Sequence, residues 1–223
     1  MSVTVIVPAA GRGERLGADK LWIEVQRRPL IAWTLQAIAA SAIFDSTVLV
    51  APPSAWERLR ALAAAAGLAD VHCAGGGERR QDSVRAGLDA TPEQGIICVH
   101  DAARPLCPPQ LFGAVVDAAA RAGAATAAVP LVDSIKRVDG DRVAESLDRA
   151  SLVAVQTPQA FDGALLREAH ERARRDSADA DDDAALVERI GHRVLVVPGD
   201  PANLKVTTPL DVVLMRTLLA APS

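Results

Sequence analysis

Cysteine is scarce in this chain of 223 residues, which has only Cys73, Cys98 and Cys107. An odd number without the paired spacing of a zinc site argues against structural zinc. The four histidines are scattered and form no ligand cluster. We therefore expect buried or idle thiols in a reducing compartment and no metal site built from side chains.

Long apolar runs are also absent, because charged residues or proline interrupt each one before the roughly 18 residues that a transmembrane helix needs. The N-terminus has neither the basic segment nor the cleavage-like site of a signal peptide. The formal net charge of −4 argues against a broad basic surface for nucleic acid. We expect a cytoplasmic protein that binds neither membrane nor nucleic acid.

Tyrosine is missing altogether, and lysine is nearly replaced by arginine. The chain has 44 alanines, 21 arginines and three lysines, Lys20, Lys136 and Lys205, which indicates a genomic compositional bias. Where most positive charges are arginine, a remaining lysine hints that a compact ammonium is needed at that position.

Half of the residues are hydrophobic, which argues against disorder, and the length suits one domain over residues 1–223. Short apolar runs alternate with longer helical patterns, which predicts a doubly wound α/β fold with a mostly parallel sheet. The predicted strands are residues 4–8, 47–51, 71–73, 96–100, 124–130 and 194–197. The predicted helices are residues 29–41, 54–66, 80–90, 108–122, 163–175, 183–190 and 209–220.

Two segments interrupt this alternation. Residues 134–143 carry an Asp-Gly turn between short polar strands, which predicts a protruding β-hairpin within an arm of about residues 132–153. The pattern leaves open whether the arm reaches another subunit or is a plain surface hairpin. Residues 176–183 form an acidic run without the glycine and distal glutamate of a calcium loop, so we expect a solvated turn that caps the next helix.

A glycine-rich loop follows the first predicted strand, where open α/β sheets bind ligands. Leu16 stands where a dinucleotide-binding loop needs glycine, and Lys20 lacks the flanking residues of a Walker A loop. Gly11 and Gly13 with the separated cations Arg15 and Lys20 suit a nucleotidyltransferase loop. A glycine-rich turn with surface charges is the alternative.

Further motifs follow in order along the chain. They are residues 75–84 (GGGERRQDSV), 100–105 (HDAARP), 130–136 (PLVDSIK), 148–149 (DR), 156–161 (QTPQAF) and 203–207 (NLKVT). With the first loop, this set resembles the 2-C-methyl-D-erythritol 4-phosphate cytidylyltransferase family over nearly the whole chain. The resemblance implies a Rossmann-like nucleotidyltransferase fold and transfer of a cytidylyl group from CTP to a polyol phosphate, with Mg²⁺ held mainly by the CTP phosphates.

The resemblance also implies residue roles. The catalytic cations would be Arg15, Lys20, Arg149 and Lys205. The residues that bind CTP would be Ala9, Ala10, Gly11, Gly13, Gly76, Gly77, Glu78, Ser83, Asp101 and Ala102. The polyol phosphate would be bound by Asp101, Arg104, Ser134, Arg149 and Lys205, and the role of Lys136 stays open.

By the same resemblance, the arm makes the protein a homodimer in which Ser134 and Arg149 complete the partner's site. Ribitol-5-phosphate is the alternative acceptor, since related enzymes share most of these motifs. Two other function classes are a non-catalytic nucleotide sensor, which loss of Arg15 or Lys20 would favour, and a nicotinamide oxidoreductase, which Leu16 disfavours. Asp181 stands where the family usually has threonine, and its carboxylate would repel a phosphate dianion.

Overall fold

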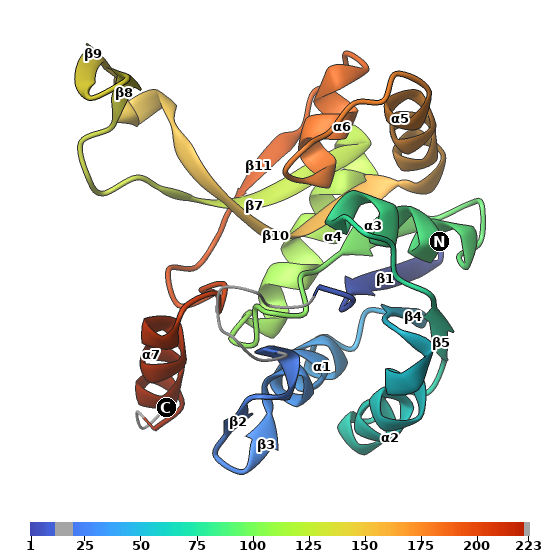
Figure 1. Ribbon diagram of the computed structural model, residues 1–223. Coiled ribbons are helices and arrows are strands. Elements are labelled where there is room, and N and C mark those ends of the chain that lie inside the picture. Colours follow the sequence, from blue (N-terminus) through green and yellow to red (C-terminus); the bar gives the residue numbers. More distant parts are fainter. Residues whose placement is uncertain (12–19, 221–223) are drawn as a thin grey trace.

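The computed structural model describes residues 1–11 and 20–220, with the side chain of Lys20 left out. Its central sheet has seven strands in the order β11-β7-β10-β6-β1-β4-β5 (Figure 1). Their bounds are Val3–Pro8 (β1), Ser46–Val50 (β4), Val71–Ala74 (β5), Ile96–Val99 (β6), Ala124–Pro130 (β7), Val153–Asp162 (β10) and Leu195–Pro198 (β11). All pairings are parallel except those of β10, so the expected mostly parallel α/β sheet is confirmed.

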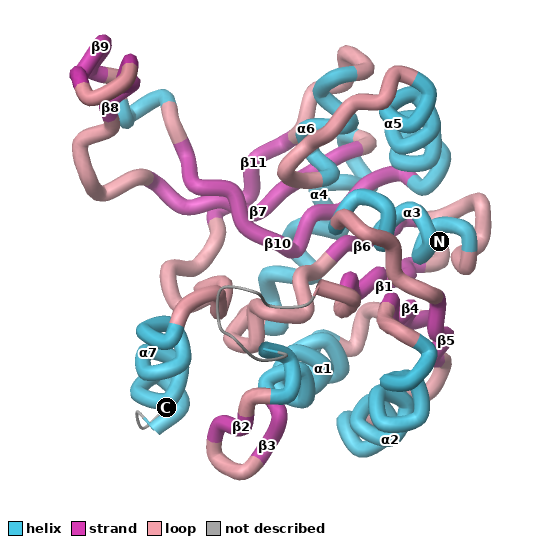
Figure 2. Tube along the Cα trace, in the orientation of Figure 1, coloured by secondary structure: helices cyan, strands magenta, loops and turns pink. Residues whose placement is uncertain are grey.

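Helices cover both faces of the sheet (Figures 1 and 2). They are α1 (Leu30–Ser41), α2 (Trp56–Ala66), α3 (Arg80–Asp89), α4 (Pro109–Ala122), α5 (Gly163–Arg175), α6 (Asp183–Arg189) and α7 (Pro209–Ala220). Side chains of α1, α2, α4 and α7 join the core on one face, and those of α3, α5 and α6 join the core on the other. The fold is therefore doubly wound, and each predicted helix agrees to within two residues at either end.

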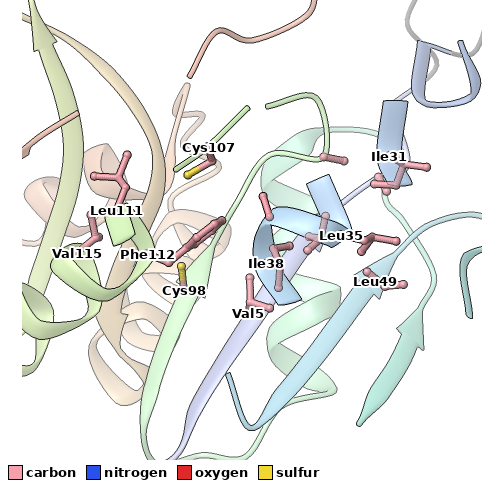
Figure 3. Packing of buried hydrophobic residues seen from close by; sticks show 14 of the residues in the cluster. Val5, Ile31, Leu35, Ile38, Leu49, Cys98, Cys107, Leu111, Phe112 and Val115 are labelled. Atoms are coloured by element: carbon pink, nitrogen blue, oxygen red, sulfur yellow. The ribbon is translucent and has the colours of Figure 1, made fainter. Parts of the chain in front are cut away.

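The larger core lies between the sheet and helices α1 and α4 (Figure 3). From adjacent strands, Cys98 lies next to the fully buried Phe112 of α4, and Val5 lies next to Ile38 of α1. The second and third cysteines of the chain, Cys98 and Cys107, are buried, and all three are free, as expected. Burial raises the pKa of the Cys98 thiol well above its usual value, so this thiol stays protonated and packs as a small apolar group.

Strand β10 was missed by the sequence patterns, although it lies inside the sheet between β6 and β7. Pro158 and the polar residues around it are unlike a central strand. The structure accommodates them at an irregularity, because the register with β7 shifts between Val155 and Gln159. Gln156 and Gln159 are buried there with hydrogen-bonded amides.

The arm leaves the sheet after Pro130 and returns at Val153, which pairs with Pro130. At its tip, β8 (Lys136–Asp139) and β9 (Arg142–Ser146) form the expected hairpin, well away from the sheet in Figure 1. Gly140 takes a positive φ of 58° at the first position of the two-residue turn, as type II′ hairpins require. A short η4 turn (Arg149–Ser151) leads back to the sheet.

Three small elements complete the fold: a second hairpin of β2 (Glu24–Val25) and β3 (Arg28–Pro29), and the turns η2 (Lys20–Trp22) and η3 (Pro53–Ala55). Within residues 1–11 and 20–220, no helix combines the length and apolar character needed to cross a membrane.

Candidate functional site

A pocket opens where several strands end. Strands β1 and β6 are parallel neighbours, so the segments after Pro8 and after Val99 meet at one edge of the sheet. The segment before α3 and the loop before α7 complete the walls. The pocket is lined by Ala9, Ala10, Gly11, Gly77, Glu78, Arg80, Ser83, Asp101, Ala102 and Lys205, among others.

Small residues make one wall because the backbones approach closely there. A Cβ added to Gly76 would lie 2.0 Å from the Cβ of Ala10, and one added to Gly77 would lie 2.4 Å from the Cβ of Asp82. The Gly77 N–H donates to the Ser83 hydroxyl at 3.1 Å, and this hydroxyl faces the carbonyl of Arg79 at 3.2 Å. The glycine segment is thus fastened to α3, and its backbone groups border a narrow space.

Charge concentrates at Asp101, whose side chain is only 9% exposed. One carboxylate oxygen accepts from Arg80 Nε at 2.9 Å, and the other lies 2.6 Å from Lys205 Nζ. Burial alone would raise the pKa of Asp101, but Arg80 and Lys205 outweigh it and hold the pKa far below its usual value. Asp101 is therefore a permanent anion between two cations.

Hydrogen bonds among Thr157, His100 and Arg104 form a layer on the buried side of Asp101 and hold its backbone in place. The Asp101 N–H donates to the Thr157 hydroxyl at 2.9 Å, and that hydroxyl lies 3.3 Å from His100 Nδ1. The other ring nitrogen of His100 lies 3.1 Å from the Arg104 carbonyl. Burial lowers the pKa of His100 to about 4, so the imidazole is neutral at pH 7.

Arg104 is also part of this layer. Its Nη1 donates to the Asn203 carbonyl at 2.7 Å, which ties the loop of Asp101 to the loop that carries Lys205. Burial lowers the pKa of Arg104, although nearby Asp101 opposes this effect. The Asn203 amide donates to Gln156 and Thr157 of β10, so the strand that the sequence patterns missed holds the floor of the site.

The acidic run differs from the expected solvated turn. Asp182 does cap α6 by accepting from the Ala185 N–H at 2.8 Å. Asp183, however, is fully buried and contacts Arg80 at 2.7 Å and His170 at 2.9 Å. Asp181 is exposed and does not line the pocket. The guanidinium of Arg80 and the hydrogen bond with His170 explain how one residue of a polar run can enter the core.

The family model for 2-C-methyl-D-erythritol 4-phosphate cytidylyltransferase matches residues 3–221. The chain belongs to this family. It is therefore a cytidylyltransferase, an enzyme of the nucleotidyltransferase class.

Individual relatives agree with the family model. The enzyme of that name from Bacillus velezensis is 41% identical over 227 residues, covering 100% of this chain and 98% of the relative. The one from Halalkalibacterium halodurans is 40% identical, covering 99% and 98%. The crystal structure of the Thermus thermophilus enzyme is 36% identical, with a TM-score of 0.83 and coverage of 99% of this chain and 100% of that one. The ribitol-phosphate alternative finds no support among them.

The cytidylyltransferase pocket gathers most of the residues that the motifs singled out. Nine of them line it: Ala9, Ala10, Gly11, Gly77, Glu78, Ser83, Asp101, Ala102 and Lys205. Gly76 lies against Ala10, and Arg104 lies in the supporting layer. Gly13, Arg15 and the side chain of Lys20 fall outside the described residues. The individual roles of all these residues stay predictions.

Ser134 and Arg149 are placed elsewhere. Both are exposed on the arm, outside the lining of this chain's pocket. The Arg149 guanidinium donates to the carbonyl of Val132, within the arm itself. Neither residue therefore lies in the pocket of its own chain as the structure describes it.

Arg80 is the main residue that the motif analysis missed. It lies in the GGGERRQDSV segment, but it was not assigned a role there. A cation at the first position of a helix is disfavoured by the helix dipole, so its presence could have indicated buried carboxylate partners.

Proposed function

We propose that this chain transfers the cytidylyl group of CTP to 2-C-methyl-D-erythritol 4-phosphate, giving 4-diphosphocytidyl-2-C-methyl-D-erythritol and pyrophosphate. The observation that carries the proposal is the pocket of a cytidylyltransferase-family chain in which Asp101 and Lys205 face a wall of glycine and alanine. Relatives that match the chain over its full length bear this enzyme's name.

The small-residue wall suits a pyrimidine base. Gly76, Gly77 and Ala10 leave a narrow space bordered by backbone groups, which can pair with the amine and carbonyl of cytosine. A purine is larger and would need these backbones to separate. Selection for CTP would thus rest on backbone geometry, with Ser83 holding the wall in place.

The chemistry is one in-line displacement at phosphorus. An oxygen of the acceptor phosphate forms a bond to the α-phosphorus of CTP, and the bond from that phosphorus to the pyrophosphate oxygen breaks. Negative charge builds on the oxygens around phosphorus, so catalysis needs cations and positioning rather than a protein nucleophile. Lys205 and Arg104 would bind the acceptor phosphate, and Arg15 and Lys20 would neutralise the triphosphate.

Mg²⁺ is the expected metal, and the residues present fit an ion held mainly by phosphates. Within residues 1–11 and 20–220, no three His, Cys, Asp or Glu side chains gather as a metal site. Both carboxylate oxygens of Asp101 are already engaged by Arg80 and Lys205. A bound Mg²⁺ would supply charge neutralisation on the triphosphate.

The arm would complete the enzyme as a homodimer. Its tip is exposed and carries apolar side chains, Val138 and Val143 being 64% and 63% exposed. Exposed apolar residues of this kind suit burial against a second copy. Ser134 and Arg149 would then enter the partner's pocket. The whole chain, residues 1–223, would act as one cytidylyltransferase domain in the cytoplasm.

The test is pyrophosphate release with CTP and Mg²⁺, using methylerythritol phosphate, ribitol-5-phosphate or no acceptor. The proposal expects release only with methylerythritol phosphate. Preference for ribitol-5-phosphate would keep the mechanism and change the acceptor. No release with either acceptor would contradict the proposed reaction.

A further inference from the structure

Five ionisable side chains form a continuous series of contacts that begins in the pocket and ends behind it. Lys205 Nζ lies 2.6 Å from Asp101, and Asp101 lies 2.9 Å from Arg80 Nε. Arg80 Nη1 lies 2.7 Å from Asp183, and Asp183 lies 2.9 Å from His170 Nε2. The series links the loop before α7 with α3, α6 and α5.

Arg80 is the member that joins the two carboxylates. Its Nε faces Asp101 and its Nη1 faces Asp183, so a single planar guanidinium contacts both anions. Burial by itself would lower the pKa of Arg80, but Asp183 and Asp101 outweigh it and raise the pKa. A lysine ammonium could contact one carboxylate well but could not reproduce this fork.

Asp183 is the anchor of the series. It is fully buried and does not line the pocket, so it has no route to a substrate except through Arg80. Burial alone would raise the pKa of Asp183, but Arg80 and the hydrogen bond with His170 lower it. His170 is itself buried on α5 and fixes the second oxygen of Asp183.

We propose that Arg80, anchored by Asp183, is a positioning residue that fixes the orientation of Asp101 and thereby the place of the Lys205 ammonium. Without Arg80, one oxygen of Asp101 would lose its partner and the carboxylate could rotate toward Lys205. Lys205, already 2.6 Å from Asp101, would then be held more closely by this carboxylate and would be less available to the acceptor phosphate. The inference rests on the proposed function for its kinetic consequences, but its geometry stands on these contacts alone.

The kinetic test uses Asp183→Asn and Arg80→Lys. Because a displacement of about 1 Å costs about a hundredfold in rate, we expect kcat/KM for the acceptor to fall tenfold to a hundredfold in both variants. The KM for CTP should change less than the KM for the acceptor, because the Gly77 backbone is held by Ser83 and not by the Arg80 side chain. Near-normal activity of Arg80→Lys would mean that Arg80 supplies charge only, which would overturn the proposal.

Asp176→Asn is the matched control. Asp176 also pairs with an arginine, Arg189, at 3.0 Å and lies close in sequence to Asp183, but the pair is half exposed and outside the pocket. Its kinetic constants should match those of the wild type. If Asp183→Asn behaves like this control, or if both KM values rise together with a lowered melting temperature, the positioning role is excluded.

A second readout needs no catalysis. With only three lysines in the chain, trace acetylation followed by mass spectrometry can follow Lys205 against the exposed Lys136 as internal reference. In Arg80→Met, Asp101 is left to Lys205 alone, so Lys205 should react about threefold more slowly relative to Lys136. An unchanged ratio would overturn the inference. An inactive wild type with the expected labelling shift would instead refute the proposed function alone.

Discussion

The pocket and the arm differ in what holds their charged side chains. In the pocket, Asp101 and Arg80 are mostly buried, and each has two charged partners within 3 Å. On the arm, the Arg137–Glu145 pair spans 3.2 Å with its side chains 67% and 51% exposed. Exposed pairs of this kind contribute little to stability, whereas buried charges demand their partners.

This difference indicates which contacts fix the side-chain positions in each region. The pocket side chains are fixed by the chain's own fold, so they can be positioned before any ligand binds. The arm side chains have few contacts with the rest of the chain, so their positions would be fixed only against a second copy. We therefore expect substitutions in the pocket to impair the chain that carries them. Substitutions in the arm should instead impair the pocket of the partner chain.

The largest effect is expected for Lys205→Met. Loss of a cation directed at the reacting phosphates costs about 3–4 kcal/mol, a hundredfold or more in kcat/KM. Lys136→Met is the matched control on the arm, where Lys136 is exposed and bonds only Ser146 among the described residues. Pyrophosphate release measures both. Equal losses in the two variants would erase the distinction between pocket and arm.

Arg149→Met should also lower activity, by about tenfold to a hundredfold, because the proposed arginine–phosphate contact would be lost. The sharper experiment mixes this variant with Lys205→Met by co-expression. In half of a random population the two different variants pair, and each such dimer has one pocket with both residues intact. About a quarter of the wild-type activity should return.

Failure of the mixed sample to regain activity, although the two variants associate, would place Arg149 in its own chain's pocket or outside catalysis. The mass of the wild-type particle, measured by light scattering, provides the control. A monomer with full activity would contradict the role proposed for the arm.

Local sequence patterns were enough for most of the architecture. The glycine and proline residues that bound the elements, together with apolar periodicity, located every helix of the described chain and six of the seven sheet strands. They also located the hairpin tip, because Gly140 is required by the geometry of the turn. These features depend on neighbours along the chain, which a sequence displays directly.

Apart from the small β2–β3 hairpin, the misses involve contacts between residues distant in sequence. Strand β10 has Pro158 and buried glutamines, which become acceptable only through partners such as Asp200 and Thr126. Asp183 looks like a surface residue until Arg80, 103 positions away, is placed beside it. No local pattern reveals such a partner, so the support of the pocket was less predictable than its lining.

The buried, neutral His100 should make the stability of the fold depend on pH. Because its folded pKa of about 4 lies below the usual 6.5, the unfolded chain binds the proton first and stability is lost as pH falls below 6.5. We expect the free energy of unfolding to drop by about 2 kcal/mol between pH 7 and 4.5. Asp101 and Asp183, with lowered pKa values, lose their contributions only at still lower pH.

Denaturant titrations over this pH range would measure the effect. His100→Gln should remove most of the slope, even though it lowers stability at pH 7. His72→Gln is the control, since His72 is half exposed and pairs with Asp70 at the surface. If the slope persists without His100, the pH dependence arises elsewhere.

The smallest effect is expected at the small-residue wall of Gly76, Gly77 and Ala10. In Gly76→Ala the new methyl group would lie 2.0 Å from the Ala10 Cβ, so one of the two segments must shift. We expect the KM for CTP to rise about fivefold or more with little change in acceptor KM, because the shift would weaken the proposed backbone contacts to the base. Gly75→Ala is the matched control, since nothing lies within 4 Å of its added Cβ. Equal behaviour of the two variants would show that the close approach of Gly76 and Ala10 does not shape the nucleotide site.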